Sequence, residues 1–140
     1  MAIKSATPYL ILGGRADEAI PFYERALGLR LESLQRFGDS MHDCPVALED
    51  QVMHAVLQHG GTTIFLADGA PDGVPPPGGT VNVALDFDSE ESLRRSFDLL
   101  AEGGKVVQAV IQAPWGLFGA LQDRFGINWM FSTTSVTARG

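Results

Sequence analysis

The sequence has one cysteine, three histidines, ten basic residues and no hydrophobic run long enough to cross a bilayer. Because Cys44 has no second cysteine to pair with, an internal disulfide is excluded and a reducing cytoplasm is the expected location. A membrane helix needs about 20 apolar residues, and the apolar run at 9–12 is also too short for a signal peptide. The net charge of −7 disfavours nucleic acid and anionic membranes as partners.

The chain has enough hydrophobic residues to form a core. The chain has 140 residues, 45% of them hydrophobic, and no low-complexity segment. This size fits one domain, or two small modules that share a core.

The stretch 121–131 predicts a β-hairpin. Its turn ends at Gly126, which can adopt a positive φ. After the turn Ile127, Trp129 and Phe131 alternate along one face of a strand, which leaves the residues between them on the other face.

The stretch 57–66 repeats this plan. Superposing Gly61 on Gly126 also places Phe65 on Met130. A hairpin that occurs twice, about half a chain apart, indicates a duplicated unit.

The remaining elements follow the same order in both halves. The first half predicts strands at 7–12, 29–37, 52–58 and 62–67, a helix at 16–27 and a long loop at 37–51. The second half predicts strands at 81–87 and 105–112 before the hairpin, and a helix whose capping box pairs Asp88 with Glu91. We therefore predict an α+β fold of two βαβββ modules, 1–68 and 81–135, joined by a Gly/Pro-rich linker at 69–80 within one compact domain.

Four segments carry a resemblance to a known family. They are Pro-Tyr-Leu at 8–10, the helix segment at 19–28, His-Ala at 54–55 leading to 64–68, and Asp-Arg-Phe-Gly-Ile-Asn-Trp-Met at 123–130. The pattern resembles the vicinal oxygen chelate superfamily of glyoxalases, bleomycin-resistance proteins and extradiol dioxygenases, and within it the PhnB-like branch. The resemblance implies paired modules that curl into a cup around a small-molecule site, usually in a homodimer.

The resemblance also implies a divalent metal, held by His and Glu from the first and last strands of each module. Those positions fall on Pro8, Phe65, Asn82 and Met130. Proline and phenylalanine offer no donor, and asparagine and methionine are poor substitutes for the imidazole and carboxylate groups that Zn²⁺ or Mn²⁺ requires. Shifting the alignment of these ligand positions by one residue in either direction places no His, Asp or Glu there either. We therefore predict a cup without a metal or other cofactor.

Several other residues allow two interpretations. His54 could face the cup as a general base or hydrogen-bonding contact, or it could be a buried histidine bonded to a neighbouring strand. The aromatic residues of the last strands could line the cup or pack in the core. The loop His42-Asp43-Cys44 could hold a metal or a nucleophile, but a solvated loop is favoured.

We predict a protein that binds a small organic molecule in an apolar, metal-free cup. The alternative is a glyoxalase-like lyase or isomerase that uses His54 or an unidentified metal site, so the sequence leaves open whether the protein is an enzyme. A regulatory module with a vestigial cup is a third hypothesis. The candidate ligand-binding residues are Pro8, His54, Phe65, Asn82, Trp115, Phe118, Trp129 and Met130.

Overall fold

The computed structural model describes residues 2–40, 43–69 and 81–133. The chain divides into two compact units, Met1–Pro76 and Pro77–Gly140. Each unit contains one four-stranded mixed sheet and a long helix, which confirms the predicted α+β class. The predicted linker lies outside the described residues from position 70 onward.

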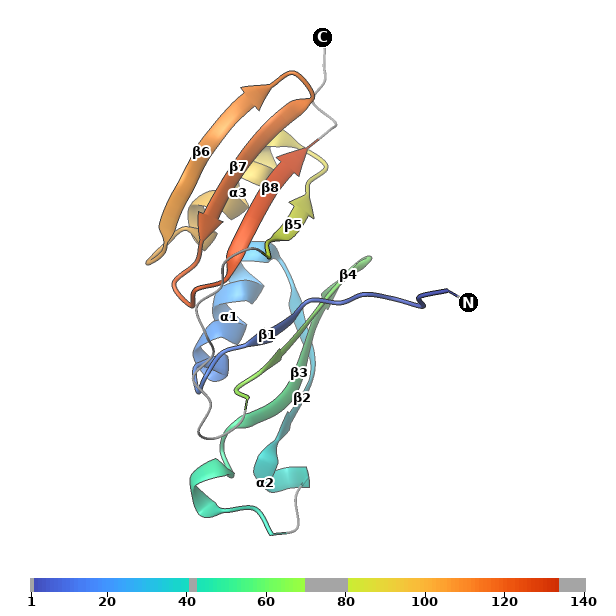
Figure 1. Cartoon of the computed structure of the whole chain (residues 1–140), viewed down its shortest axis with the longest axis vertical. Coiled ribbons are helices and arrows are strands. Elements are labelled where there is room, and N and C mark those ends of the chain that lie inside the picture. The colour runs from blue at the N-terminus through green and yellow to red at the C-terminus, as the bar shows by residue number, and fades with distance from the viewer. Residues whose placement is uncertain (1, 41–42, 70–80, 134–140) are drawn as a thin grey trace. The chain divides into compact units, whose positions relative to one another are not determined.

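The first unit builds its sheet in the order β1-β4-β3-β2 (Figure 1). Its elements are β1 (Tyr9–Ile11), α1 (Ala16–Leu27), β2 (Arg30–Arg36), β3 (Val52–His59) and β4 (Thr62–Ala67). β1 runs parallel to β4, and the other pairs are antiparallel. The helix predicted at 16–27 is confirmed, because its apolar side chains recur at helical spacing and pack on β2 and β3.

A buried carboxylate fixes the start of α1. Asp68 is 2% exposed and follows β4 directly. Its Oδ1 accepts from the backbone N–H of Ala16 at 2.8 Å, and its Oδ2 accepts from the N–H of Val52 at 2.7 Å. Asp68 therefore joins the beginnings of α1 and β3 to the end of β4, and it supplies the helix cap that Arg15 does not.

Two parts of the first unit differ from the prediction. The loop predicted at 37–51 contains α2 (Phe37–Ser40) and a 3₁₀ turn, η1 (Val46–Leu48). Backbone bonds from Phe37 to Gln51 and from Gly38 to Glu49 hold the ends of this segment together. The strand predicted at 7–12 is shorter, because Pro8 has no N–H to donate and contributes only its carbonyl, which accepts from the N–H of Phe65.

The second unit repeats the topology in the order β5-β8-β7-β6, with β5 parallel to β8 (Figure 1). Its elements are β5 (Val83–Asp86), α3 (Glu90–Leu100), β6 (Lys105–Ala113), β7 (Gly116–Gln122) and β8 (Asn128–Thr133). The same strand order in both units confirms the predicted pair of βαβββ modules.

The predicted hairpin turn is also confirmed. Gly126 has φ +87°, and Oδ1 of Asp123 accepts from the N–H groups of Phe125 and Ile127. The helix cap lies one residue later than predicted. Ser89 is the N-cap, and its Oγ accepts from the N–H of Ser92 at 3.1 Å.

Aromatic contacts form the core of the second unit. The ring of Phe131 stacks on Phe87 at a centroid distance of 5.4 Å and meets the edge of Phe97 from α3 at 5.1 Å. Leu93 and Leu100 complete the buried face of α3. None of the helices in the described part of the chain is long and apolar enough to span a bilayer.

Candidate functional site

The sheet of the first unit carries an aromatic cluster on the face opposite its core. Side chains alternate between the two faces of a strand, and the inward set, such as Leu10 on β1 and Leu66 on β4, is buried. The other face bears Tyr9, Ile11, His54, Val56 and Phe65, which are half-buried or exposed and which we call the Tyr9 face.

Three rings of the Tyr9 face contact one another. The hydroxyl of Tyr9 and Nδ1 of His54 are hydrogen-bonded at 2.8 Å. The ring of Phe65 lies 4.9 Å from His54 and 5.6 Å from Tyr9, measured between centroids. Nε2 of His54 has no hydrogen-bond partner among the residues that the structure describes. The cluster thus combines an apolar aromatic surface with one polar nitrogen that remains free.

Strand register produces this cluster. Tyr9 on β1 lies beside Phe65 on β4, and Phe65 lies opposite Val56 on β3. His54 is two residues before Val56 on the same face, which makes it a diagonal neighbour of Phe65. Residues far apart in the sequence therefore meet because β4 lies between β1 and β3 in the sheet.

The second unit has a corresponding face, which we call the Met130 face. Met130 on β8 lies between Ala84 of β5 and Ala120 of β7. Phe118 and Ser132, an adjacent cross-strand pair, share this face. The small alanine side chains flank the half-buried thioether of Met130.

The remaining candidate residues lie elsewhere. Trp129 is 0% exposed in the core of the second unit and donates its indole N–H to Asp123, so the prediction that it contacts a ligand is wrong. Trp115 is 61% exposed in the turn between β6 and β7. Asn82 is exposed and precedes β5, and Pro8 precedes β1. The structure therefore groups His54 with Phe65, and Phe118 with Met130.

Tyr9 is the residue that sequence reasoning missed. The family's ligand position aligns with Pro8, which has no side-chain donor, whereas the polar group of this segment is the hydroxyl of the next residue. Because Leu10 and Leu12 are the inward residues of this segment, the two-residue alternation of a strand directs Tyr9 to the other face. That alternation was the signal available in the sequence.

In the described part of its loop, Cys44 is not an activated nucleophile. Partial desolvation raises the pKa of the Cys44 thiol, and the carboxylate of Glu49 raises it further. A nucleophilic cysteine requires the opposite shift, since the thiolate is the reactive form. His42 lies outside the described residues.

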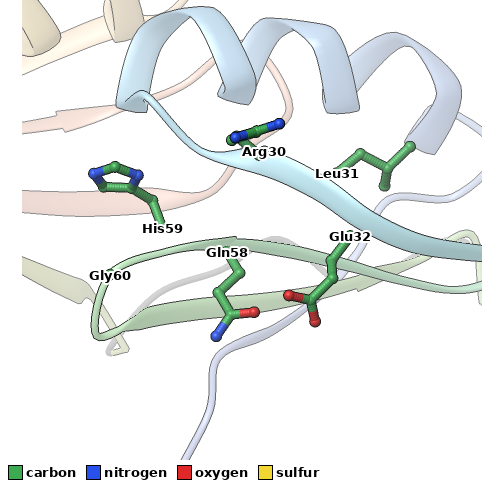
Figure 2. A pocket seen from close by; sticks show the side chains of 6 residues that line it. All are labelled: Arg30, Leu31, Glu32, Gln58, His59 and Gly60. Carbon is green, nitrogen blue, oxygen red and sulfur yellow. The ribbon is translucent and has the colours of Figure 1, made fainter.

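A polar pocket of about 440 Å³ lies at the start of β2 and the β3–β4 turn (Figure 2). Arg30 and His59 lie on one side of the strand pair, and Gln58 and Glu32 on the other. With its amide nitrogen toward the carboxylate, Gln58 donates to Oε1 of Glu32 at 3.0 Å. Leu31 is the one apolar side chain in the lining. An apolar ligand has little to contact here, so the Tyr9 face is the stronger candidate.

A family model, the Glyoxalase/Bleomycin resistance protein/Dioxygenase superfamily, matches residues 6–131. The chain belongs to this superfamily. Protein YjdN of Escherichia coli (strain K12) is 32% identical over 137 residues, which cover 90% of this chain and 92% of that protein. The predicted family is thereby confirmed.

Two solved structures share the fold. The crystal structure of protein PA1353 from Pseudomonas aeruginosa is 34% identical, with a TM-score of 0.83 over 94% of this chain and 98% of that one. A Bacillus cereus protein described as a putative 3-demethylubiquinone-9 3-methyltransferase, PhnB protein, is 22% identical, with a TM-score of 0.73 over 93% and 99% of the two chains. The PhnB-like resemblance is confirmed at the level of the fold.

The side chains on the first and last strands of each unit are not the ligands that the metal expected of the superfamily requires. β1 and β4 present Tyr9 and Phe65, and β5 and β8 present Ala84 and Met130. Tyr9 is already bonded to His54, and the other three offer no imidazole or carboxylate. Within the described part of the chain, no group of three His, Cys, Asp or Glu side chains could hold a metal ion.

Proposed function

We propose that this superfamily member binds a small, largely apolar organic molecule without a catalytic metal. The observation that carries the proposal is the Tyr9–His54–Phe65 cluster. Two of its residues, Tyr9 on β1 and Phe65 on β4, stand on the strands from which the superfamily's metal ligands are expected, and His54 lies on the neighbouring β3. An apolar surface with few polar groups is the usual character of a small-molecule site.

The donor set supports the metal-free part of the proposal. A hard or borderline cation requires several anionic or imidazole ligands at once. His54 is the one imidazole on the Tyr9 face, and its Nδ1 is engaged by Tyr9. Phe65 and Met130 give the two faces apolar character instead.

A direct test titrates the full chain with N-phenyl-1-naphthylamine, an uncharged aromatic probe that fluoresces in apolar surroundings. We expect saturable binding with the same affinity before and after dialysis against EDTA. Phe65→Ser should abolish this binding. Val46→Ser, which changes an exposed apolar residue of η1, is the matched control and should leave it intact. Loss of binding with EDTA and recovery with Zn²⁺, Ni²⁺ or Mn²⁺ would overturn the metal-free proposal.

The second candidate is a glyoxalase-like lyase or isomerase with His54 as general base. The observation in its favour is the 2.8 Å hydrogen bond between the Tyr9 hydroxyl and Nδ1, because a base is oriented when its second nitrogen is held. This candidate requires the tautomer in which Nδ1–H donates to the oxygen of Tyr9, so that Nε2 is unprotonated and can accept the proton. The test is turnover of the hemithioacetal of methylglyoxal and glutathione. Activity lost in His54→Gln and kept in His59→Gln would favour this candidate. No turnover, with or without added divalent metal, would reject it.

A homodimer and a cytoplasmic location remain predictions. Sedimentation equilibrium of the full chain tests the first: a single species of twice the 15.0 kDa chain mass is expected. A monomer at all concentrations would contradict it.

A further inference from the structure

We propose that the Tyr9–His54 pair is a hydrogen-bond donor that selects aromatic ligands bearing an acceptor oxygen, such as a carboxylate, sulfonate or carbonyl group. This inference rests on the proposed function, because it requires that the Tyr9 face bind a small molecule. It adds the chemical class of the ligand and the atom, Nε2 of His54, that recognises it.

The number of polar hydrogens on Tyr9 and His54 indicates that one N–H donor of the pair is available to a ligand. A neutral tyrosine and a neutral histidine carry one polar hydrogen each, and the bond between Tyr9 and His54 uses one of the two. Imidazole nitrogen is a better acceptor than a phenol oxygen, so the hydroxyl donates to Nδ1 and the second hydrogen lies on Nε2. Nε2 has no partner among the described residues, which leaves this N–H for a ligand.

The surroundings of His54 favour an aromatic group beside that donor. The ring of Phe65 is tilted by 58° against the imidazole and by 72° against Tyr9, so the three rings expose both edges and faces. Val56, the cross-strand partner of Phe65, extends the apolar surface. A ligand ring can pack on Phe65 and Val56 while its oxygen accepts from Nε2.

The charge pattern is compatible with an anionic oxygen. None of the five residues that define the Tyr9 face is acidic. The residue opposite His54 on β2 is Gln35, a neutral amide. Glu32 is an acidic residue on the same side of the sheet, but its carboxylate accepts from Gln58, two positions beyond Val56 on β3.

The experiment compares two probes that differ by one acidic group. 1-Anilinonaphthalene-8-sulfonate has the ring system of N-phenyl-1-naphthylamine and adds a sulfonate. We expect the full chain to bind the sulfonate probe about tenfold more tightly, the difference that one hydrogen bond to a charged group makes. Binding is followed by probe fluorescence, and circular dichroism verifies the fold of every variant.

Two substitutions at His54 separate recognition from structure. Asparagine keeps a polar atom at the place of Nδ1, facing Tyr9, but has nothing at the place of Nε2. Glutamine keeps a donor near Nε2 and loses the group that faces Tyr9. We expect His54→Asn to lower the affinity for the sulfonate probe about tenfold and the affinity for the uncharged probe less than about twofold. His54→Gln should lower the affinity for the sulfonate probe less than about threefold. His59→Asn, at the exposed end of the same strand, is the control and should change neither.

Each contrary result has a defined meaning. If the His54→Asn variant still binds the sulfonate probe with native affinity and the His54→Gln variant does not, His54 acts on the structure through its bond to Tyr9. The donor role of Nε2 is then rejected. If the native chain binds both probes equally, or His54→Asn weakens both equally, the selection for oxygen is rejected while the proposed function stands. If the native chain binds neither probe, the proposed function and this inference both fail.

Discussion

The indole N–H of Trp129 donates to Oδ2 of Asp123 at 2.8 Å, and both side chains are buried in the second unit. Oδ1 of the same carboxylate accepts from the backbone N–H groups of Phe125 and Ile127. One side chain thus satisfies three donors in and after the hairpin turn. The stability of the β7–β8 hairpin should depend on this carboxylate.

Replacement of Asp123 by asparagine should lower the free energy of unfolding by about 1–3 kcal/mol. The amide oxygen can still accept from the turn, but the amide nitrogen then faces the indole N–H, and two buried donors oppose each other. Urea unfolding, followed by far-UV circular dichroism, measures the loss. Asp98→Asn is the control, because Asp98 is exposed on α3 and makes no hydrogen bond or ion pair with the described residues. It should stay within about 0.5 kcal/mol of the native chain. Equal stabilities for the two variants would contradict the proposed importance of Asp123.

Gly119 allows α3 to approach β7 closely. A Cβ at this position would lie 2.9 Å from Cε1 of Phe97 and 3.0 Å from Cγ2 of Val110. Gly119→Ala should therefore destabilise the protein by about 1–3 kcal/mol through overpacking. Gly61→Ala is the matched control, because a Cβ there meets no atom within 4 Å. Thermal unfolding of the two variants gives the comparison, and an unchanged melting temperature for Gly119→Ala would show that the core adapts.

Hydrophobic spacing made most of the fold predictable. The helix Ala16–Leu27 and the strand Thr62–Ala67 have the predicted bounds, since their apolar residues repeat with the period of the element and glycine or polar residues end them. The short elements α2 and η1 were missed. They depend on backbone bonds such as that from Gly38 to Glu49, and side-chain periodicity does not report such bonds.

The candidate site was less predictable, because the two-residue alternation of side chains along a strand does not show which face of the strand is buried under other elements. Trp129 and Met130 are neighbours, and the alternation assigned them to opposite faces, as the structure confirms. The sequence nevertheless predicts both as ligand-binding residues, and burial excludes Trp129. Which of the two faces is buried depends on where α3 packs, a tertiary property. The Tyr9–His54 bond joins residues 45 positions apart and likewise needed the strand order.

The ion pair between Asp17 and Arg36 predicts a small pH dependence of stability. Two hydrogen bonds, of 2.8 and 2.9 Å, join the groups, and this bonding to Arg36 lowers the pKa of Asp17 below its ordinary value of 3.8. A carboxyl whose pKa is lowered on folding stabilises the native state above the unfolded pKa, and this contribution is lost as the pH falls through the folded pKa.

Asp17→Asn should therefore lower the free energy of unfolding by about 0.2–1 kcal/mol at pH 7. The value is modest because both side chains are substantially exposed. The difference from the native chain should vanish in acid, below the lowered pKa of Asp17. Urea unfolding at low salt, at pH 7 and in acid, measures both values. A double-mutant cycle with Arg36→Gln isolates the pair. A difference that persists at the acid end would show that Asp17 acts through something other than its charge.

The two tryptophans should report different events during ligand titration. Trp129 is 0% exposed and bonded to Asp123, whereas Trp115 is 61% exposed in the β6–β7 turn. A ligand can contact the indole of Trp115 directly, but it can reach Trp129 only if the core opens. In Trp115→Phe, the remaining emission should therefore come from a buried indole and resist quenching by acrylamide. Trp129→Phe should retain an accessible, readily quenched indole, although loss of the bond to Asp123 lowers its stability. Strong acrylamide quenching in folded Trp115→Phe would mean that the core around Trp129 opens readily, and any quenching by a ligand could then no longer be attributed to Trp115 alone.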